Sequence, residues 1–213
     1  MDGQRSIART GRAVSALAPD IVCYQEVHRR LPWSGWGDQA RQLGRATAMR
    51  IEFLPTIPLP WGGYGIAVGS RLPIASVSSV YLPGGRERRG LLRVDVNSGS
   101  GVLRVCCTHL GLSEDERVRQ IDAIAAEVNA SPHDVALMGD FNERAGGEAV
   151  KRLLDVCALR DAGSGSDLPT YPSDKPDARI DFAFCSPGLS VRSVSVVETL
   201  ASDHLPVVVD MDI

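Results

Sequence analysis

The sequence predicts an α/β fold in which two mainly antiparallel sheets pack together and helices cover their outer faces. Two observations predict it. Short apolar runs of strand length recur in both halves of the 213-residue chain, and stretches with apolar residues at helical spacing lie between them. Packed layers of sheet and helix are the arrangement that buries all of these apolar faces. No repeat or linker divides the chain, so we expect one domain over residues 1–213.

Helices are predicted where apolar residues recur every three to four positions. The clearest has Ser113 as its N-cap and Asp115 and Glu116 in its first turn. A first helix begins near Ile7 and is ended by Pro19. The predicted helices cover residues 7–17, 37–49, 113–129 and 148–156.

Strands are predicted at the short apolar runs. They cover residues 21–24, 51–54, 66–69, 74–82, 91–96, 102–108, 135–138, 180–185, 191–197 and 207–211. The stretch PTIPLPWGGYG between the second and third runs is rich in Pro and Gly, which predicts a loop. It carries Trp61 and Tyr64, and another loop carries Trp33 and Trp36. These rings could stack on a base, enter lipid or serve as packing anchors.

The composition constrains partners and compartment. Lys and Arg number 23 against 26 Asp and Glu, a net charge of −3, so no strongly nucleic-acid-adapted surface is indicated. A bound divalent metal can nevertheless reverse the sign of an acidic cleft. Five cysteines without metal-finger spacing indicate reduced thiols. No signal peptide or transmembrane segment is recognisable, so we expect a soluble cytoplasmic protein.

Acidic, His and Asn side chains stand repeatedly at the ends of predicted strands. They are Glu26, His109, Asp140, Asn142 and Asp181, joined by Asp203 and His204 just before the last strand. Strand ends converge at one edge of a sheet, so these residues can meet there. Hard cations such as Mg²⁺ need oxygen ligands, which Glu26, Asp140 and Asp203 would supply. His204 with Asp181 would form an oriented imidazole.

The motifs also carry a family resemblance. In order, IVCYQEV, YGIAVGSRLPI, THLG, LMGDFNE, YPSDKPDARIDFAF and SDHLPVVV cover residues from about 14 to 210. Each string alone is short and unspecific, but their order and approximate spacing are a strong signal. Together they resemble the DNase I-like endonuclease/exonuclease/phosphatase superfamily.

This resemblance implies a four-layered α/β sandwich that hydrolyses phosphodiesters or phosphomonoesters with Mg²⁺ or Mn²⁺. It implies Glu26 as metal ligand with help from Asp203, and Asp140 as the carboxylate that positions the water or the leaving group. Members act on DNA, RNA, lipid headgroups and nucleotide cofactors, so the fold leaves the substrate open.

The same resemblance assigns the remaining polar residues to the phosphate. Asn142 would be the phosphate-binding amide, His204 would contact the scissile phosphate, and Asp181 would orient that imidazole. His109 would be a second histidine on the phosphate-facing wall.

One departure concerns the first strand. Family members begin with a strand that carries an Asn, in a pattern like LTWNVH, and the sequence has no counterpart of it before the first helix. We therefore expect an open position in one sheet, with backbone hydrogen-bonding groups exposed. A misplaced or trimmed start is the expected cause, because the later motifs are intact.

The resulting hypothesis is a metal-dependent phosphoesterase that acts by attack of an activated water on a phosphate-ester substrate. Two alternatives stay open: a nuclease acting on DNA or RNA, and a binding module that is catalytically compromised. Arg71 and Arg89 are candidate phosphate-binding residues. Arg117 and Gln120 are expected to be solvated or to cap a helix, and no protein partner is implied.

Overall fold

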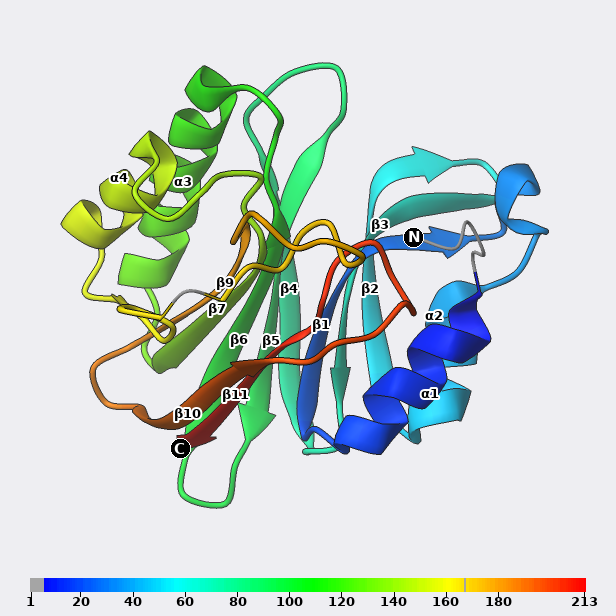
Figure 1. Cartoon of the computed structure of the whole chain (residues 1–213), viewed down its shortest axis with the longest axis horizontal. Coiled ribbons are helices and arrows are strands. Elements are labelled where there is room, and N and C mark those ends of the chain that lie inside the picture. Colours follow the sequence, from blue (N-terminus) through cyan, green and yellow to red (C-terminus); the bar gives the residue numbers. More distant parts are fainter. Residues whose placement is uncertain (1–5, 167) are drawn as a thin grey trace.

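Four layers make up the fold, as the sequence predicts (Figure 1). In the computed structural model, which describes residues 6–166 and 168–213, two groups of strands pack face to face in the centre. Two helices cover each outer face of this pair.

The larger sheet has six strands in the order β4-β5-β6-β7-β9-β8. They are β4 (Ile74–Leu82), β5 (Arg89–Asn97), β6 (Val102–His109), β7 (Asp134–Asp140), β9 (Asp181–Cys185) and β8 (Arg160–Asp161). Only β6 and β7 run parallel in this sheet. Parallel neighbours need a crossover, and helix α3 (Glu114–Asn129) supplies it. Helix α4 (Glu148–Val156) lies beside α3 on the same face.

The second central layer contains two smaller groups of strands. Strands β1 (Ile21–Arg29), β3 (Gly62–Ser70) and β2 (Arg50–Leu59) form an antiparallel sheet in the order β1-β3-β2. β10 (Ser190–Val196) and β11 (Val207–Asp212) form a separate antiparallel pair. In the described part of the chain β1 pairs with β3 alone, so one of its edges lies open, in line with the expected open position.

The outer helices of this second layer are α1 (Ile7–Leu17) and α2 (Gln39–Thr47). A single turn of 3₁₀ helix, η1 (Pro32–Ser34), follows β1. The Asp38 side chain caps α2 by accepting the Arg41 amide, the usual way to satisfy an orphan donor at a helix start.

Three apolar clusters hold the four layers together. One joins the large sheet to α3 and α4, with Leu91 and Ile121 fully buried. The central one lies between the sheets and contains Val68 and Val105. The third packs Tyr24 of β1 and Leu43 of α2. Because each layer shares a core with the next, we propose that residues 1–213 act as one domain.

The β2–β3 hairpin corrects the sequence analysis, which predicts a loop over PTIPLPWGGYG. β2 continues to Leu59 because it is an edge strand, where Pro55 and Pro58 need not donate to a neighbour on the open side. A register shift between Pro55 and Ile57 absorbs the irregularity. Gly65 is required opposite it, because a Cβ there would lie 1.9 Å from the Leu54 carbonyl oxygen. The two-residue strand β8 was not predicted.

The five cysteines are free thiols, and four of them are buried. No helix in residues 6–166 or 168–213 is long and apolar enough to cross a bilayer.

A buried aromatic trio beneath α3 and α4 gives a test of this packing. Phe184 is fully buried, and its ring lies 5.1 Å from Phe141 and 5.4 Å from Phe182. We expect Phe184→Ala to lower the free energy of unfolding by about 3–5 kcal/mol, because it leaves a cavity. Leu154→Ala, at an exposed position of α4, should change it by only about 0.5 kcal/mol. Urea unfolding followed by circular dichroism measures both, and equal effects would contradict this core.

Candidate active site

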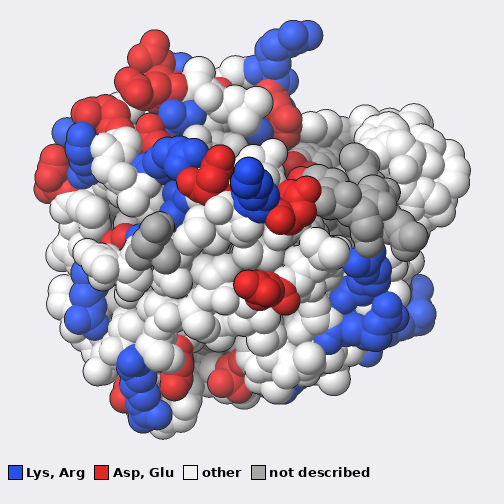
Figure 2. Space-filling view, viewed as in Figure 1, with Lys and Arg blue, Asp and Glu red and all other residues white. Residues whose placement is uncertain are grey.

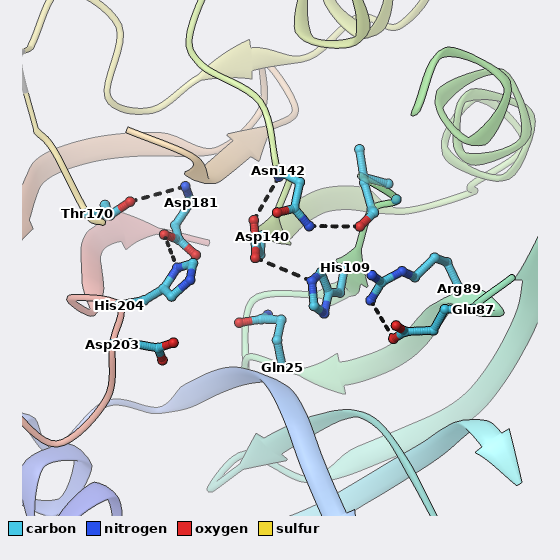
Figure 3. A network of polar contacts seen from close by, with 12 residues as sticks. Gln25, Glu87, Arg89, His109, Asp140, Asn142, Thr170, Asp181, Asp203 and His204 are labelled. Atoms are coloured by element: carbon cyan, nitrogen blue, oxygen red, sulfur yellow. Dashed lines mark hydrogen bonds and ion pairs between the residues drawn. The ribbon is translucent and has the colours of Figure 1, made fainter. Parts of the chain in front are cut away.

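Three polar residues lie in one row across neighbouring strands of the large sheet. In the β6–β7 pairing His109 is level with Asp140, and in the β7–β9 pairing Asp140 is level with Asp181. The row requires Gly139, whose φ is +155° and where a Cβ would lie 2.0 Å from the Thr108 carbonyl oxygen. The strand ends predicted to converge therefore do so for these three residues (Figure 3).

His204 joins this row through an ion pair. Its Nδ1 lies 2.9 Å from Oδ2 of Asp181, so Nδ1–H donates to the carboxylate and Nε2 is left for another partner. The Tyr171 ring packs on the imidazole at 4.8 Å. The Leu205 amide donates to the Thr170 carbonyl at 2.7 Å. The loop before β11 is thereby held against the loop before β9.

Thr170 stabilises the same pair by binding the backbone of Asp181 and its neighbour. It is fully buried, and its hydroxyl oxygen accepts the amides of Ile180 and Asp181 at 3.3 and 3.4 Å. Sequence reasoning missed Thr170 and Tyr171. Their only signal was that Tyr171 begins the YPSDKPDARIDFAF segment and Thr170 immediately precedes it.

The two histidines have opposite electrostatic environments. Burial, reinforced by Arg89 and His204, lowers the pKa of His109 to about 3, so this imidazole is neutral. Burial also opposes a charge on His204, but the hydrogen bond and charge of Asp181, with Asp140 and Asp203, outweigh it and raise its pKa to about 9. The site thus presents one neutral imidazole and one imidazolium at neutral pH.

Asp140 occupies the centre of the row and is nearly buried. Burial and the neighbouring Asp181 carboxylate raise its pKa to about 6. Its Oδ1 accepts the Asn142 amide at 2.7 Å, and its Oδ2 lies 3.4 Å from Nε2 of His109. A carboxylate with this pKa can take up a proton near neutral pH.

Asn142 turns the chain just after Asp140. Its φ of +49° is left-handed, a conformation that Asn tolerates better than most residues. Its side-chain amide donates to the Leu110 carbonyl at 2.9 Å and so joins the loops that follow β6 and β7. Asn142 thus lies beside Asp140, and its contact with phosphate stays a prediction.

Buried polar contacts lock these two loops, which corrects the expectation for Arg117 and Gln120. Both side chains are buried in α3. Gln120 accepts the Gly111 amide at 2.8 Å, and Arg117 pairs with Glu143 at 3.0 Å. Glu143 in turn accepts the Ala149 amide at the start of α4. Helical spacing alone gave no sign that a charged pair would be buried here.

β1 delivers Gln25 and Glu26 at a bulge. Between Tyr24 and Val27 two residues of β1 face one residue of β3, and Glu26 has a φ of +58°. Gln25 is directed toward Asp140 and His109 (Figure 3). Glu26 is exposed and lies beside Tyr64, where its charge adds to burial in raising the pKa of the phenol. The sequence analysis did not single out Gln25.

The remaining predicted residues differ in where they lie. Asp203 is exposed next to His204, and Arg89 is buried beside His109 and pairs with Glu87 at 3.0 Å (Figure 3). Arg71 follows β3 at the end away from the bulge and reaches the Ala18 and Thr47 carbonyls at 3.5 Å. The structure does not bring Arg71 to the row.

The donor set at the centre of the site suits a hard cation. Ligand atoms of Asp140, Asp181 and His204 lie within 4.8 Å of one another. Burial and then repulsion by Asp181 raise the pKa of Asp140, and a divalent cation would relieve this repulsion. Carboxylate oxygens are the ligands that Mg²⁺ and Mn²⁺ prefer. Among the described residues, Glu26 does not belong to this group of three.

A carboxylate and histidine cluster at the strand ends of a four-layered α/β sandwich defines the class of protein. Residues 2–204 match the model of the endonuclease/exonuclease/phosphatase family, so the chain belongs to this family. A relative, the uncharacterised protein YbhP of Escherichia coli K12, is 31% identical over 183 residues, which cover 79% of this chain and 72% of YbhP.

Solved structures show the same fold. An endonuclease/exonuclease/phosphatase from Beutenbergia cavernae superposes with a TM-score of 0.80 at 28% identity, over 98% of this chain and 66% of that one. The mannosyl-6-phosphatase Bt3783 of Bacteroides thetaiotaomicron gives a TM-score of 0.82 at 16% identity, over 97% of this chain and 90% of that one. At this identity, the similarity to the mannosyl-6-phosphatase shows the fold alone.

The His204–Asp181 pair makes a pH-dependent prediction for the metal-free protein. We expect His204 to titrate near pH 9 and to shift toward about 6.5 in Asp181→Asn, which removes the charge. Because the folded pKa is raised, the stabilisation is complete below about pH 6.5 and is lost as pH rises through about 9.

Imidazole NMR in the presence of chelator measures the titration, and denaturant unfolding at pH 6 and pH 10 measures the stability. The exposed Asp177→Asn serves as the matched control, since its partner Arg144 is also exposed. An unchanged His204 titration in Asp181→Asn would refute the pair.

Proposed function

We propose that this chain hydrolyses a phosphoric ester with a divalent cation, Mg²⁺ or Mn²⁺, using a water molecule as nucleophile. The observation that carries the proposal is the combination of an imidazolium held by Asp181 and a carboxylate of raised pKa, Asp140, within one cluster. Hydrolysis of an anionic ester needs a positive group for the phosphoryl oxygens and a proton acceptor for water, and these two residues supply both.

In the proposed reaction water attacks phosphorus in line with the departing oxygen. The new bond joins the water oxygen to phosphorus, and the bond from phosphorus to the ester oxygen breaks. The ester oxygen leaves with the bonding electron pair and takes a proton from solvent to form the alcohol. Asp140 takes the proton of the water, and Nε2–H of His204 donates to a phosphoryl oxygen. Nδ1–H of His204 stays on Asp181, which keeps the ring oriented.

The neighbouring residues complete the arrangement. His109 is neutral and can donate one hydrogen bond to the phosphoryl group without adding charge. The carboxylates of Asp140 and Asp181 within the cluster, together with those of Asp203 and Glu26, are the groups that would hold the cation, while the protonated ring of His204 faces the phosphoryl group. A bound divalent cation would supply charge neutralisation at the phosphoryl oxygens and a more acidic water.

Arg89 extends the phosphate-binding wall. Its side chain is buried, and its Nε has no hydrogen-bond partner among the described residues. A planar guanidinium can bind two phosphate oxygens at once. We also keep a cytoplasmic location as a proposal, which the five free thiols favour.

The central test is hydrolysis of bis(p-nitrophenyl) phosphate with Mg²⁺ or Mn²⁺. We expect turnover that chelator abolishes, and we expect His204→Ala and Asp140→Ala each to lower kcat by about 10²–10⁴-fold, because each removes a proton-transfer or charge-stabilising group. His133→Ala, in the turn before β7, is the matched control and should retain activity.

Circular dichroism of each variant separates lost chemistry from lost folding. Parallel assays with a monoester, plasmid DNA and single strands distinguish the phosphatase and nuclease alternatives. Metal binding without turnover on any of these substrates would favour the binding module instead and would sink the proposal.

Arg89 gives a second test at the same site. Arg89→Met should lower kcat/KM for an anionic ester by about 10–100-fold, since it removes a buried charge-assisted hydrogen bond. Glu87→Gln, which keeps Arg89 but weakens its ion pair, should lower kcat/KM much less. Steady-state kinetics with both variants checks this order, and the reverse order would count against a phosphate contact by Arg89.

A further inference from the structure

All three tryptophans of the sequence lie exposed at one end of the molecule. The exposed fractions are 64% for Trp33, 59% for Trp36 and 51% for Trp61, and Ile57 is 37% exposed. We call these four residues the tryptophan tip. Arg29 at the end of β1 pairs with Gly63 at the start of β3, so the loop after β1 and the β2–β3 turn lie together. Figure 2 shows an uncharged lobe projecting on this side.

The tip continues inward as an apolar pocket that leads toward the candidate active site. The pocket has a volume of about 380 Å³. Its lining residues are His28, Leu31, Trp33, Ile57, Leu59, Tyr64 and Glu87. Glu87 is the ion-pair partner of Arg89, which lies beside His109 (Figure 3). The ion pair of Glu87 with Arg89 therefore connects the apolar pocket to the row that contains His109.

The segment that carries the tip is basic although the chain is acidic. Between residues 29 and 64 there are five arginines and two acidic residues, Asp38 and Glu52, a net charge of 5 − 2 = +3. The whole chain has a net charge of −3, so the remainder carries −3 − 3 = −6. Figure 2 shows basic side chains gathered over α1 and α2 next to the lobe. Apolar groups flanked by cations fit an anionic, partly apolar partner.

We propose that the tryptophan tip docks on an anionic lipid bilayer. Indole rings settle at the boundary between headgroups and acyl chains, and Ile57 adds aliphatic surface that can enter the acyl region. The arginines attract the negative headgroups. A nucleic acid strand fits less well, because Ile57 and Leu59 offer no aromatic face on which a base could stack.

Docking in this orientation would bring the apolar pocket and the neighbouring row of polar residues to the bilayer surface. If the proposed hydrolysis is taken as given, phosphate esters in lipid headgroups are then the substrates within reach, and this consequence rests on that proposed function. The docking itself depends on the tip, the pocket and the charge, so it can be tested without metal or substrate.

The test uses metal-free protein and vesicles of phosphatidylcholine, with or without half phosphatidylglycerol. Because every tryptophan of the sequence lies in the tip, fluorescence excited selectively at tryptophan reports on this surface alone. We expect a blue shift and co-sedimentation with the anionic vesicles. Trp33→Ser/Trp36→Ser/Trp61→Ser should lower co-sedimentation at least about tenfold. Arg30→Gln should lower the partition coefficient about fivefold. It keeps all three tryptophans, so the emission of the protein without vesicles should not change.

Controls make the outcomes distinct. Leu154→Ser removes an exposed apolar side chain on α4, across the molecule, and should bind like the wild type. His204→Ala should bind normally, so loss of activity and loss of docking are separable. Fluorescence unchanged by either vesicle overturns the proposal. A blue shift with single-stranded DNA, or with rising protein concentration alone, and none with vesicles would assign the tip to nucleic acid or to self-association and overturn it equally.

Discussion

The pairing of β7 with its two neighbours is the constraint on which the candidate site depends. Parallel pairing with β6 sets His109 level with Asp140, and antiparallel pairing with β9 sets Asp181 level with Asp140. The backbone hydrogen bonds of the sheet thus fix the spacing of three side chains that are far apart in sequence. Gly139 permits this close approach of β6 and β7. A site placed on rigid strands in this way is organised before substrate arrives.

The cost of this arrangement is electrostatic. Asp140 and Asp181 are brought together where water is largely excluded, and the raised pKa of Asp140 reports their repulsion and burial. His204 offsets part of it through its pair with Asp181. A cation at the same cluster would offset the rest, which is why the metal and the imidazolium are best understood as parts of one charge balance.

The sequence predicted the layers and the row because both follow from local patterns. Apolar runs ending in His or Asp located the ends of β6 and β7, and an Asp before an apolar run located the start of β9. The helical spacing at 113–129 located α3 within one residue. What it missed depends on contacts distant in sequence. Thr170 matters only because its hydroxyl reaches the amides ten residues on. The ion pair of Arg117 with Glu143 is buried only once α3 packs on the loop after β7.

The prediction of a loop in place of the β2–β3 hairpin was wrong for a related reason. Pro and Gly usually mark loops, but an edge strand tolerates Pro55, and Gly65 allows a close backbone approach. The role of Glu26 stays a prediction on the same grounds, because a bulge decides which of Gln25 and Glu26 faces the row, and alternation along a strand cannot foresee a bulge.

β1 links the two functional regions proposed for this chain. Its bulge directs Gln25 at the row, and His28, three residues on, lines the apolar pocket. The loop that follows carries Trp33 and Trp36. β1 is rigid, and the segment that separates Gln25 from the tip is short. A surface that binds the tip would therefore fix the orientation of the row relative to that surface. If the tip docks as proposed, the surface on which the protein rests positions the candidate row through the geometry of a single strand, without any moving part.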